Sequence, residues 1–211
     1  MCEGAYSIVI LANGQFPGSD NALECLRQAE QIICCDGALD KLVAAGYKPT
    51  AIVGDLDSAQ KSSLLRWKDR LHPDKSEEYN DLQKALKYCI ANGLNHVTLL
   101  GCGGLREDHF IANLSIMATY SEQLDLKMVT DHGTFIAIRQ TTTLPSTKGQ
   151  LVSVFCKDEH LPLTFHNLKY PVHERCFQHL WEGSLNEALG NEFTIELHSE
   201  GVVVVYIGNS Q

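Results

Sequence analysis

The sequence is short of basic residues and has no long apolar run, and each shortage excludes a class of protein. It holds 17 Lys and Arg against 26 Asp and Glu, a net charge of −9. Nucleic acids and anionic membranes attract basic faces, so neither is an expected partner. No apolar run approaches the roughly 20 residues that span a bilayer. The first residues, MCEGAYSIVILANG, lack the basic start of a signal peptide. We therefore expect a cytoplasmic protein.

The sequence also lacks any Cys-x-x-Cys pair, although it has eight cysteines. Cys25, Cys34, Cys35 and Cys89 stand in apolar patterns. Zinc sites and redox centres usually need closely spaced pairs, and disulfide frameworks belong to secreted chains. We interpret the cysteines as reduced, mostly buried thiols. The nine histidines likewise show no metal-ligand spacing, and we interpret most of them as ordinary residues.

In its first 130 residues, the chain alternates apolar strand-like runs with helical patterns. The clearest helix is 80–92, where one apolar face repeats at helical spacing. Continuous apolar strands separated by helices indicate a parallel sheet covered on both faces. The other predicted helices are 39–45, 59–67 and 107–120, the last with Phe110, Ile111, Leu114, Met117 and Ala118 on one side. The predicted strands are 7–12, 31–35, 50–53, 96–100 and 126–130.

After Asp131 the pattern changes to short β-type runs separated by Thr- and Pro-containing stretches such as 141–147. Such runs are typical of a small antiparallel β-sandwich. The sequence thus predicts an α/β protein with a parallel-sheet, Rossmann-like N-terminal domain, 1–132, and a smaller C-terminal antiparallel β-sandwich domain, 133–211. The predicted strands of the second domain are 134–138, 150–155, 161–165, 192–197 and 202–207.

Aspartates follow the predicted strands of the first domain. Asp36 directly follows the strand QIICC, Asp55 and Asp57 follow TAIV, Asp81 opens the helix 80–92, and Asp108 follows HVTLL after a glycine-rich turn. The carboxyl ends of parallel strands share one edge, where ligands bind. A single aspartate there is more often a helix cap or turn residue. Here four loops bring acids to one edge, where their negative charges repel one another unless a cation lies between them. Because the ligands are oxygen atoms, the expected cation is Mg²⁺.

No Walker A motif and no Gly-x-Gly-x-x-Gly motif is present, so the phosphates of a nucleotide are not expected in a P-loop. The turn 101–104, ahead of a helix, offers backbone N–H groups to a phosphate instead. Arg106 beside this turn carries a guanidinium that matches phosphate geometry. The alternatives, a simple tight turn and a surface arginine, remain open at this point.

Taken in order, these motifs resemble those of the thiamine pyrophosphokinase family. The similarity extends into the β-rich end and covers nearly the whole chain. The motifs of the first domain are Asp36-Gly37-Ala38, Gly54-Asp55-Leu56-Asp57-Ser58, Asn80-Asp81-Leu82 and the run from Gly103 to His109. Those of the second are GQLVSV from Gly149, Leu168-Lys169-Tyr170 and Gly183-Ser184-Leu185-Asn186-Glu187.

The resemblance implies an enzyme that converts ATP and thiamine into thiamine diphosphate and AMP with Mg²⁺. It also implies a homodimer with active sites between subunits. The implied catalytic residues are Asp55, Asp57, Asp81 and Asp108, of which the first three are metal ligands. The implied nucleotide-binding residues are Asp36, Gly37, Gly103, Gly104, Arg106 and His109. The implied thiamine-binding residues are Ser184 and Asn186, and Trp181 is a candidate to stack on the substrate ring.

Three positions depart from the family pattern. Glu77 and Glu78 precede the Asn80-Asp81 motif where the family carries a basic or neutral group. Leu105 separates Gly104 from Arg106, and Leu185 splits the Ser-Asn-Glu run. Two other functions are compatible with the acids: a metal-dependent phosphohydrolase, and a catalytically inactive nucleotide or thiamine sensor.

Overall fold

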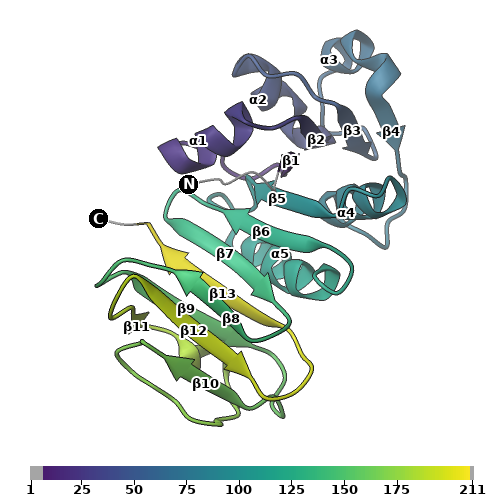
Figure 1. The fold of residues 1–211 in the computed structure, drawn as a ribbon. Coiled ribbons are helices and arrows are strands. Elements are labelled where there is room, and N and C mark those ends of the chain that lie inside the picture. Colours follow the sequence, from purple (N-terminus) through teal and green to yellow (C-terminus); the bar gives the residue numbers. More distant parts are fainter. Residues whose placement is uncertain (1–6, 210–211) are drawn as a thin grey trace. The chain divides into compact units, whose positions relative to one another are not determined.

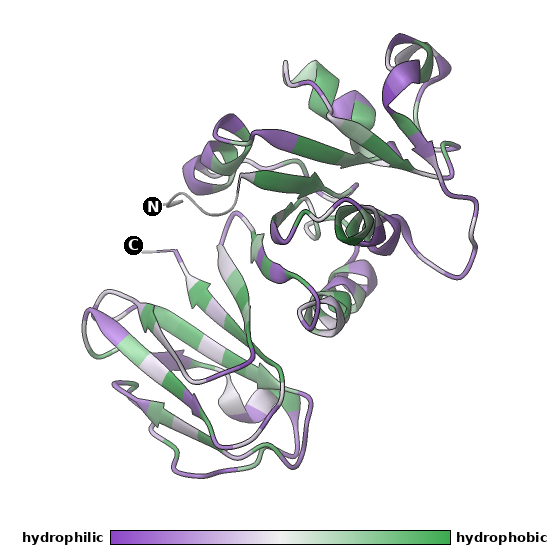
Figure 2. Cartoon of the chain, turned by 45° about the vertical axis from the view of Figure 1, so that its right-hand side comes forward, coloured by the Kyte–Doolittle hydropathy of each residue, from purple (hydrophilic) through white to green (hydrophobic). Residues whose placement is uncertain are grey.

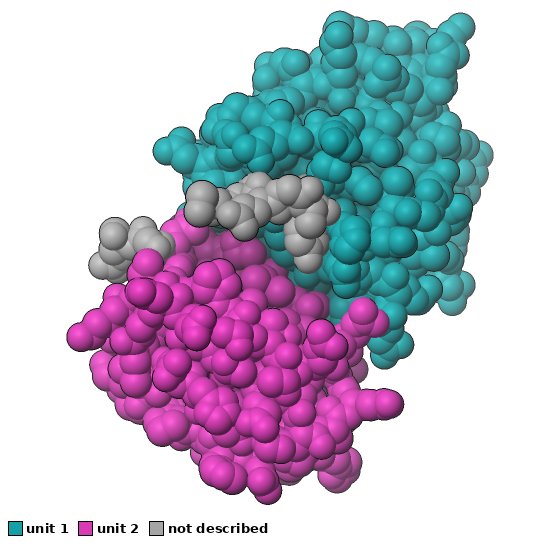
Figure 3. All heavy atoms as spheres, in the orientation of Figure 1, with its two compact units in different colours: residues 1–131 teal, residues 132–211 magenta. Residues whose placement is uncertain are grey.

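The computed structural model describes residues 7–209. The chain divides into two compact units, residues 1–131 and residues 132–211 (Figure 3). No helix in the described part of the chain is both long and apolar enough to cross a membrane. Each cysteine within that part is a free thiol, and all of these except Cys176 are buried, in agreement with the sequence interpretation.

The first unit is built on a parallel sheet with the strand order β6-β5-β1-β2-β3-β4 (Figure 1). The chain passes outward from β1 to β4 and then crosses to β5 on the other side of β1. The order therefore reverses beside β1, and such a point is where open parallel sheets bind ligands. The strands are β1 Ile8–Leu11, β2 Gln31–Cys35, β3 Ala51–Gly54, β4 Leu71–Pro73, β5 His96–Leu100 and β6 Asp125–Val129.

Helices pack against this sheet and confirm the predicted parallel α/β architecture. Helix α4 packs on β1, β2 and β3, and α5 packs on β6. The α-helices are α1 Asp20–Arg27, α2 Leu39–Ala44, α3 Lys61–Arg66, α4 Asp81–Ala91 and α5 Glu107–Tyr120. Short 3₁₀ helices η1 Asp36–Ala38 and η2 Lys68–Arg70 complete the unit.

The strands are apolar on both faces because both faces are covered. Figure 2 shows the strands β1 and β2 as hydrophobic and much of the helix surface as hydrophilic. Cys34 belongs to the buried cluster formed with α1 and α2, whereas its neighbour Cys35 does not. Successive strand residues point to opposite faces, so the two thiols lie in separate layers of the core.

Three features of the first unit differ from the sequence prediction: strand β4, which was not predicted, helix α1 and the buried face of α5. Helix α1 was not predicted, although Ser19 caps it by accepting a hydrogen bond from the backbone N–H of Ala22. The helix is only eight residues long, although its buried residues Ala22, Cys25 and Leu26 recur at helical spacing. In α5, Ile111 is 67% exposed, so its place on the buried face was wrong. The buried side chains of α5 are Asn113 and Met117.

The second unit contains two antiparallel sheets, with the orders β11-β9-β13-β7 and β10-β12-β8. Their inner faces share one apolar cluster, which makes the unit a sandwich as predicted. Within this cluster Phe165 meets Phe177 edge to face at 5.7 Å. The strands are β7 Gly133–Ile138, β8 Thr142–Pro145, β9 Leu151–Cys156, β10 Leu163–His166, β11 Asn186–Glu187, β12 Glu192–Leu197 and β13 Val203–Gly208, with η3 at Leu180–Gly183.

The stretch 141–147, predicted to separate strands, contains β8 and this prediction was wrong. Residues Thr142 to Pro145 pair with β12. Across the two strands, the hydroxyl groups of Thr143 and Thr194 form a hydrogen bond with an oxygen–oxygen distance of 2.8 Å. Threonine has a high strand propensity. The nearby prolines and polar residues concealed an edge strand that contributes only Leu144 to the core.

Candidate active site

Asp36 stands at the carboxyl end of β2 and is completely buried. One carboxylate oxygen, Oδ1, accepts the backbone N–H of Gly37 at 2.6 Å, while Oδ2 is buried and has no hydrogen-bond partner among residues 7–209. The absence of a side chain at Gly54 makes room for it, because a Cβ there would lie 2.7 Å from the Asp36 Cγ. A buried, unpartnered carboxylate oxygen costs free energy unless a cation or proton reaches it.

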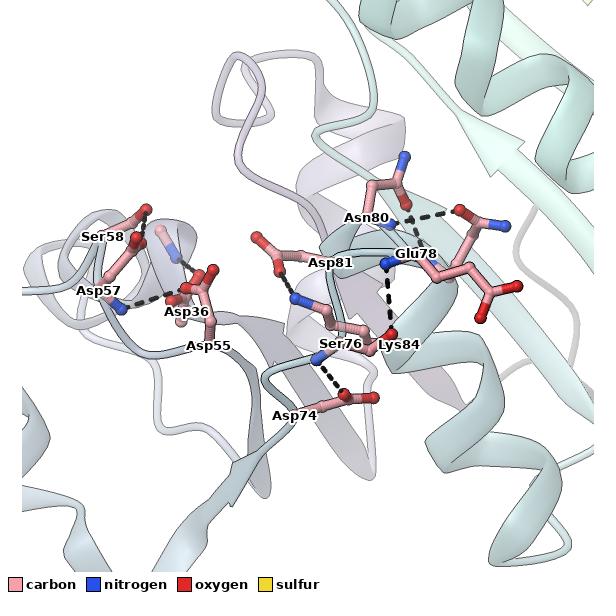
Figure 4. Close-up of polar contacts among 12 residues, drawn as sticks. Asp36, Asp55, Asp57, Ser58, Asp74, Ser76, Glu78, Asn80, Asp81 and Lys84 are labelled. Carbon is pink, nitrogen blue, oxygen red and sulfur yellow. Dashed lines mark hydrogen bonds and ion pairs between the residues drawn. The ribbon is translucent and has the colours of Figure 1, made fainter.

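Asp55 and Asp57 follow β3 on one sharp turn. Leu56 between them has a φ of +67°, a conformation that is uncommon for a non-glycine residue and concentrates at functional sites. The backbone N–H of Asp57 donates to Asp55 Oδ1 at 3.2 Å, and Ser58 Oγ donates to Asp57 Oδ1 at 2.8 Å. The strained turn thus presents two exposed carboxylates side by side (Figure 4).

Carboxylate oxygens of Asp36, Asp55 and Asp57 all lie within 4.8 Å of one another. The pKa of Asp36 is raised to about 6, chiefly by burial and then by the charges of Asp81 and Asp55. The pKa of Asp55 is lowered instead, chiefly because it accepts the N–H of Asp57. Three hard oxygen donors that gather in this way, one of them buried and unpartnered, fit a divalent cation such as Mg²⁺.

Helix α4 brings Asp81 to the same region. Asn80 caps the helix: its side chain accepts the N–H of Gln83, while Gln83 reaches back to the N–H of Asn80. This capping box fixes the first turn, which carries Asp81. Asp81 adds its charge to the surroundings of Asp36, although it lies outside the three-carboxylate group identified among residues 7–209.

Lys84, on the next turn of α4, is a site residue that the sequence analysis missed. Its side chain is only 4% exposed, and its Nζ lies 3.2 Å from Asp81 Oδ1 (Figure 4). Its charge also helps to lower the pKa of Asp55. At about 100° per residue, Lys84 lies some 200° around the helix from Leu82. Periodicity therefore placed it on the solvent side and gave no signal of its burial.

The glycine-rich turn after β5 is fastened to the loop after β1. The carbonyl of Gly101 accepts the N–H of Gly14 at 2.7 Å, and the carbonyl of Gly103 accepts the N–H of Gln15 at 2.8 Å. Gly104 has a φ of +85°, and a Cβ there would lie 2.6 Å from the Cβ of Gln15. The turn therefore requires glycine, in agreement with a tight turn, and it sits at the ligand-binding edge of the sheet.

Lys41 of α2 holds the first of these loops in place. Its Nζ donates to the backbone carbonyls of Asn13 and Gly14 and to the Asn13 side chain, at 2.9–3.3 Å. Gly37 lies close to the same loop, because a Cβ there would be 2.2 Å from Asn13 Nδ2. The loops after β1, β2 and β5 thus form one connected rim around the site.

Arg106 and Asp108 pair with each other at the start of α5. Arg106 donates from Nε to Asp108 Oδ1 at 3.1 Å and from Nη2 to Oδ2 at 2.5 Å. This contact lowers the pKa of Asp108. The two side chains are 66% and 62% exposed, and His109 beside them is exposed as well. Asp108 lies outside the three-carboxylate group of the described residues.

In the second unit, Ser184 and Asn186 hold the segment between η3 and β11. Asn186 is 4% exposed. It accepts the N–H of Tyr170 at 3.0 Å and donates to the carbonyl of Tyr170 at 2.8 Å. Ser184 Oγ donates to the carbonyl of Trp181 at 2.6 Å. The amide of Asn186 therefore fastens the 168–170 segment to β11.

Trp181 and Leu185 frame Ser184 on the surface of the second unit. Trp181 is 69% exposed and stacks on His179 with ring centroids 6.0 Å apart. Leu185 is 86% exposed and has a φ of +60°. Leu185 thus holds an apolar side chain outward on a strained backbone conformation.

Two family models match the chain. The catalytic domain of thiamin pyrophosphokinase matches residues 22–130, and its substrate-binding domain matches residues 133–206. No curated protein sequence matches this chain significantly.

Solved structures of thiamin pyrophosphokinases have the same fold. The protein from Candida albicans superposes with a TM-score of 0.81 at 15% identity, covering 100% of this chain and 95% of that one. The Bacillus subtilis protein gives 0.80 at 18% identity, covering 97% and 99%. The yeast protein gives 0.75 at 16% identity, covering 95% and 85%. At these identities the likeness concerns the fold.

Proposed function

This chain belongs to the thiamin pyrophosphokinase family, and from that premise we propose that it transfers pyrophosphate from ATP to thiamine with Mg²⁺. As a member of the family it is a diphosphotransferase that makes thiamine diphosphate from thiamine. ATP, the metal and the roles of individual residues are our proposal. The observation that carries it is the meeting of Asp36, Asp55 and Asp57 inside the segment that matches the catalytic domain.

In this proposal Asp55, Asp57 and Asp81 hold the magnesium ion, and Asp36 completes the acidic site on the nucleotide side. The unpartnered, buried Oδ2 of Asp36 supports a cation at this place. When bound, magnesium neutralises the polyphosphate and the charge that develops during transfer. The rim residues Gly37, Gly103 and Gly104, with Arg106 and His109, bind the nucleotide.

The chemistry is a displacement at the β-phosphorus of ATP. The thiamine hydroxyl oxygen forms the new P–O bond, the bond from the β-phosphorus to the α-phosphate oxygen breaks, and AMP leaves. Such transfer depends on in-line placement and charge neutralisation rather than on covalent catalysis. Asp81 or Asp108 accepts the hydroxyl proton. The ion pair with Arg106 lowers the pKa of Asp108 and makes it the weaker acceptor.

For the second unit we propose that the segment of Ser184 and Asn186 binds the pyrimidine of thiamine and that Trp181 stacks on its ring. The match of residues 133–206 to a substrate-binding domain supports this role. We further propose a cytoplasmic homodimer with active sites between subunits. The exposed apolar residues of the second unit support a partner surface: Leu151, Leu180, Trp181, Leu185 and Leu189 are each more than half exposed.

The identity of the adenine product tests the reaction. Protein incubated with ATP, Mg²⁺ and thiamine is followed by phosphorus NMR. We expect AMP and thiamine diphosphate in a one-to-one ratio, and AMP only when thiamine is present. ADP with thiamine monophosphate would mean ordinary γ-phosphoryl transfer. Phosphate release without thiamine would favour the phosphohydrolase, and bound nucleotide without turnover would favour the sensor.

A further inference from the structure

Lys84 is a buried cation among acids. Its side chain is 4% exposed, while its partner Asp81 is 33% exposed. The charges of Asp55 and Asp74 also act on it. A fully buried lysine is rare in proteins because desolvation of an ammonium is costly. A cost of this kind needs compensation from the acids around it, or from a ligand.

An ordinary helix-stabilising ion pair does not account for this burial. The chain contains such a pair in α1, where Arg27 meets Glu24 at the same spacing of three residues. There the two side chains are 49% and 41% exposed, as expected for a surface pair of small energetic value. Asp81 and Lys84 share the spacing but not the exposure. Their pair therefore belongs to the site rather than to the helix surface.

Two other cations near the ligand-binding edge, Lys41 and Arg106, already have partners within the described part of the chain. Lys41 uses its ammonium to hold the loop of Asn13 and Gly14. Arg106 is 66% exposed and donates twice to Asp108. An ammonium has three N–H donors, and among residues 7–209 Lys84 uses one of them, to Asp81. Lys84 therefore has donors to offer to a ligand.

We propose that Lys84 binds an oxygen of the polyphosphate, an assignment that rests on the proposed function. The acids of the site repel a highly charged polyphosphate, and one divalent cation offsets only part of that charge. With a metal ion on Asp81, the pairing of Lys84 with this carboxylate weakens. Its flexible four-carbon stem then carries the ammonium to the phosphate. Lys84 is thus a counter-ion in the free protein and a phosphate ligand in the complex.

The test compares Lys84→Met with Lys84→Arg and with a matched control. Lys87→Met removes the same charge from the same helix, at an exposed residue that lies over the ring of Tyr79. Calorimetry measures three ligands: Mn²⁺ alone, AMP, and α,β-methylene-ATP with Mg²⁺. In the last of these the bond broken in the proposed reaction cannot be cleaved. Thermal melting reports whether each variant is folded.

We expect Lys84→Met to weaken binding of the ATP analogue about tenfold or more, since a charge-assisted hydrogen bond is lost. AMP, which lacks the β- and γ-phosphates, should bind as before. Mn²⁺ alone should bind at least as tightly, because a nearby positive charge is gone. Lys84→Arg should retain most of the analogue affinity, and Lys87→Met all of it.

Equal losses for all three ligands would overturn the proposal, since Lys84 would then only hold Asp81 in place. Unchanged analogue binding by Lys84→Met would also overturn it. If Lys84→Met does not fold, the test rests on Lys84→Arg. The proposal would then be overturned if this variant loses affinity for the ATP analogue and for Mn²⁺ by the same factor. Failure of the proposed function looks different: the wild-type protein would form no AMP from ATP and thiamine.

Discussion

Asp36 is the residue in which the conflict between stability and function is clearest. It is fully buried, and within the described part of the chain its Oδ2 has no hydrogen-bond partner. Its pKa rises from the ordinary value of 3.8 to about 6, first because of burial. Strain of this kind persists at sites where a ligand relieves it. Burial of this carboxylate therefore lowers the stability of the folded protein, and it leaves an oxygen ready to bind a cation.

The raised pKa predicts how stability depends on pH. Between pH 4 and 6 the folded chain keeps the Asp36 proton that the unfolded chain has lost, so this residue's contribution to stability falls as pH rises. Asp36→Asn, which stays neutral, should be more stable than wild type by about 3 kcal/mol at pH 8. The difference should vanish near pH 4. Urea unfolding at the two pH values measures it, and equal stabilities at pH 8 would contradict it.

Asp57→Asn is the matched control, since Asp57 is exposed and its charge costs the fold little. Its stability should stay within about 0.5 kcal/mol of wild type, while turnover falls about 100-fold or more because a metal ligand is lost. A folded Asp57→Asn protein with near-normal turnover at saturating Mg²⁺ would remove this residue from the metal site.

At the scale of the element, a short cap or strand places several functional groups at once. The capping box of α4 sets the first turn that carries Asp81 and, one turn later, Lys84. In the second unit β11 is only two residues long, yet it pairs with β9 and anchors the 168–170 segment through Asn186. Such small elements gain their stability from side-chain hydrogen bonds to the backbone.

This arrangement predicts different effects for Ser184 and Asn186. Asn186→Ala should lower the free energy of unfolding by about 2 kcal/mol or more, because it removes a buried amide that makes two hydrogen bonds to the backbone of Tyr170. Ser184→Ala should leave stability nearly unchanged. It should raise the KM for thiamine by a much larger factor than the KM for ATP, since only ground-state binding of thiamine is lost. Thermal melts and steady-state kinetics separate the two. If Ser184→Ala raises the KM for thiamine and the KM for ATP by the same factor, the segment of Ser184 has a structural role and does not bind thiamine.

At the scale of the whole molecule, exposed apolar residues concentrate in the second unit. Leu180, Trp181 and Leu185 are 58%, 69% and 86% exposed. Scattered surface leucines are common, whereas a group around one segment marks an interaction site. A small β unit also gains by covering its apolar surface with a second copy.

We therefore predict a dimer at micromolar concentration that Leu185→Asp weakens at least about tenfold. Asp accepts the positive φ of this position more readily than Leu, so the fold should be preserved. Leu65→Asp is the control, because Leu65 in α3 is 73% exposed but lies in the other unit. Sedimentation equilibrium measures the dissociation constants. A fully active wild-type monomer, or equal effects of both substitutions, would contradict the prediction.

Much of the fold could be predicted because periodicity is a local property. The helix at 107–120 and the strand at 192–197 were predicted with the observed bounds. Strand β8 was missed because it is short and polar, whereas helix α1 was missed although the shorter helices α2 and α3 were predicted. Short elements owe their existence to contacts with distant segments, such as the pairing of β8 with β12, and local sequence does not record those contacts.

The sequence by itself determined the two-part α/β and β architecture, the family, and which acids follow the parallel strands. Chain connectivity is enough for this, since carboxyl ends of parallel strands meet at one edge. Only the tertiary structure decided that Asp36 is buried with its Oδ2 unpaired among the described residues, that Lys84 is enclosed beside Asp81, and that Asp108 pairs with Arg106. Burial and pairing depend on which segments pack together in three dimensions, and the same residue types would be solvated ions elsewhere.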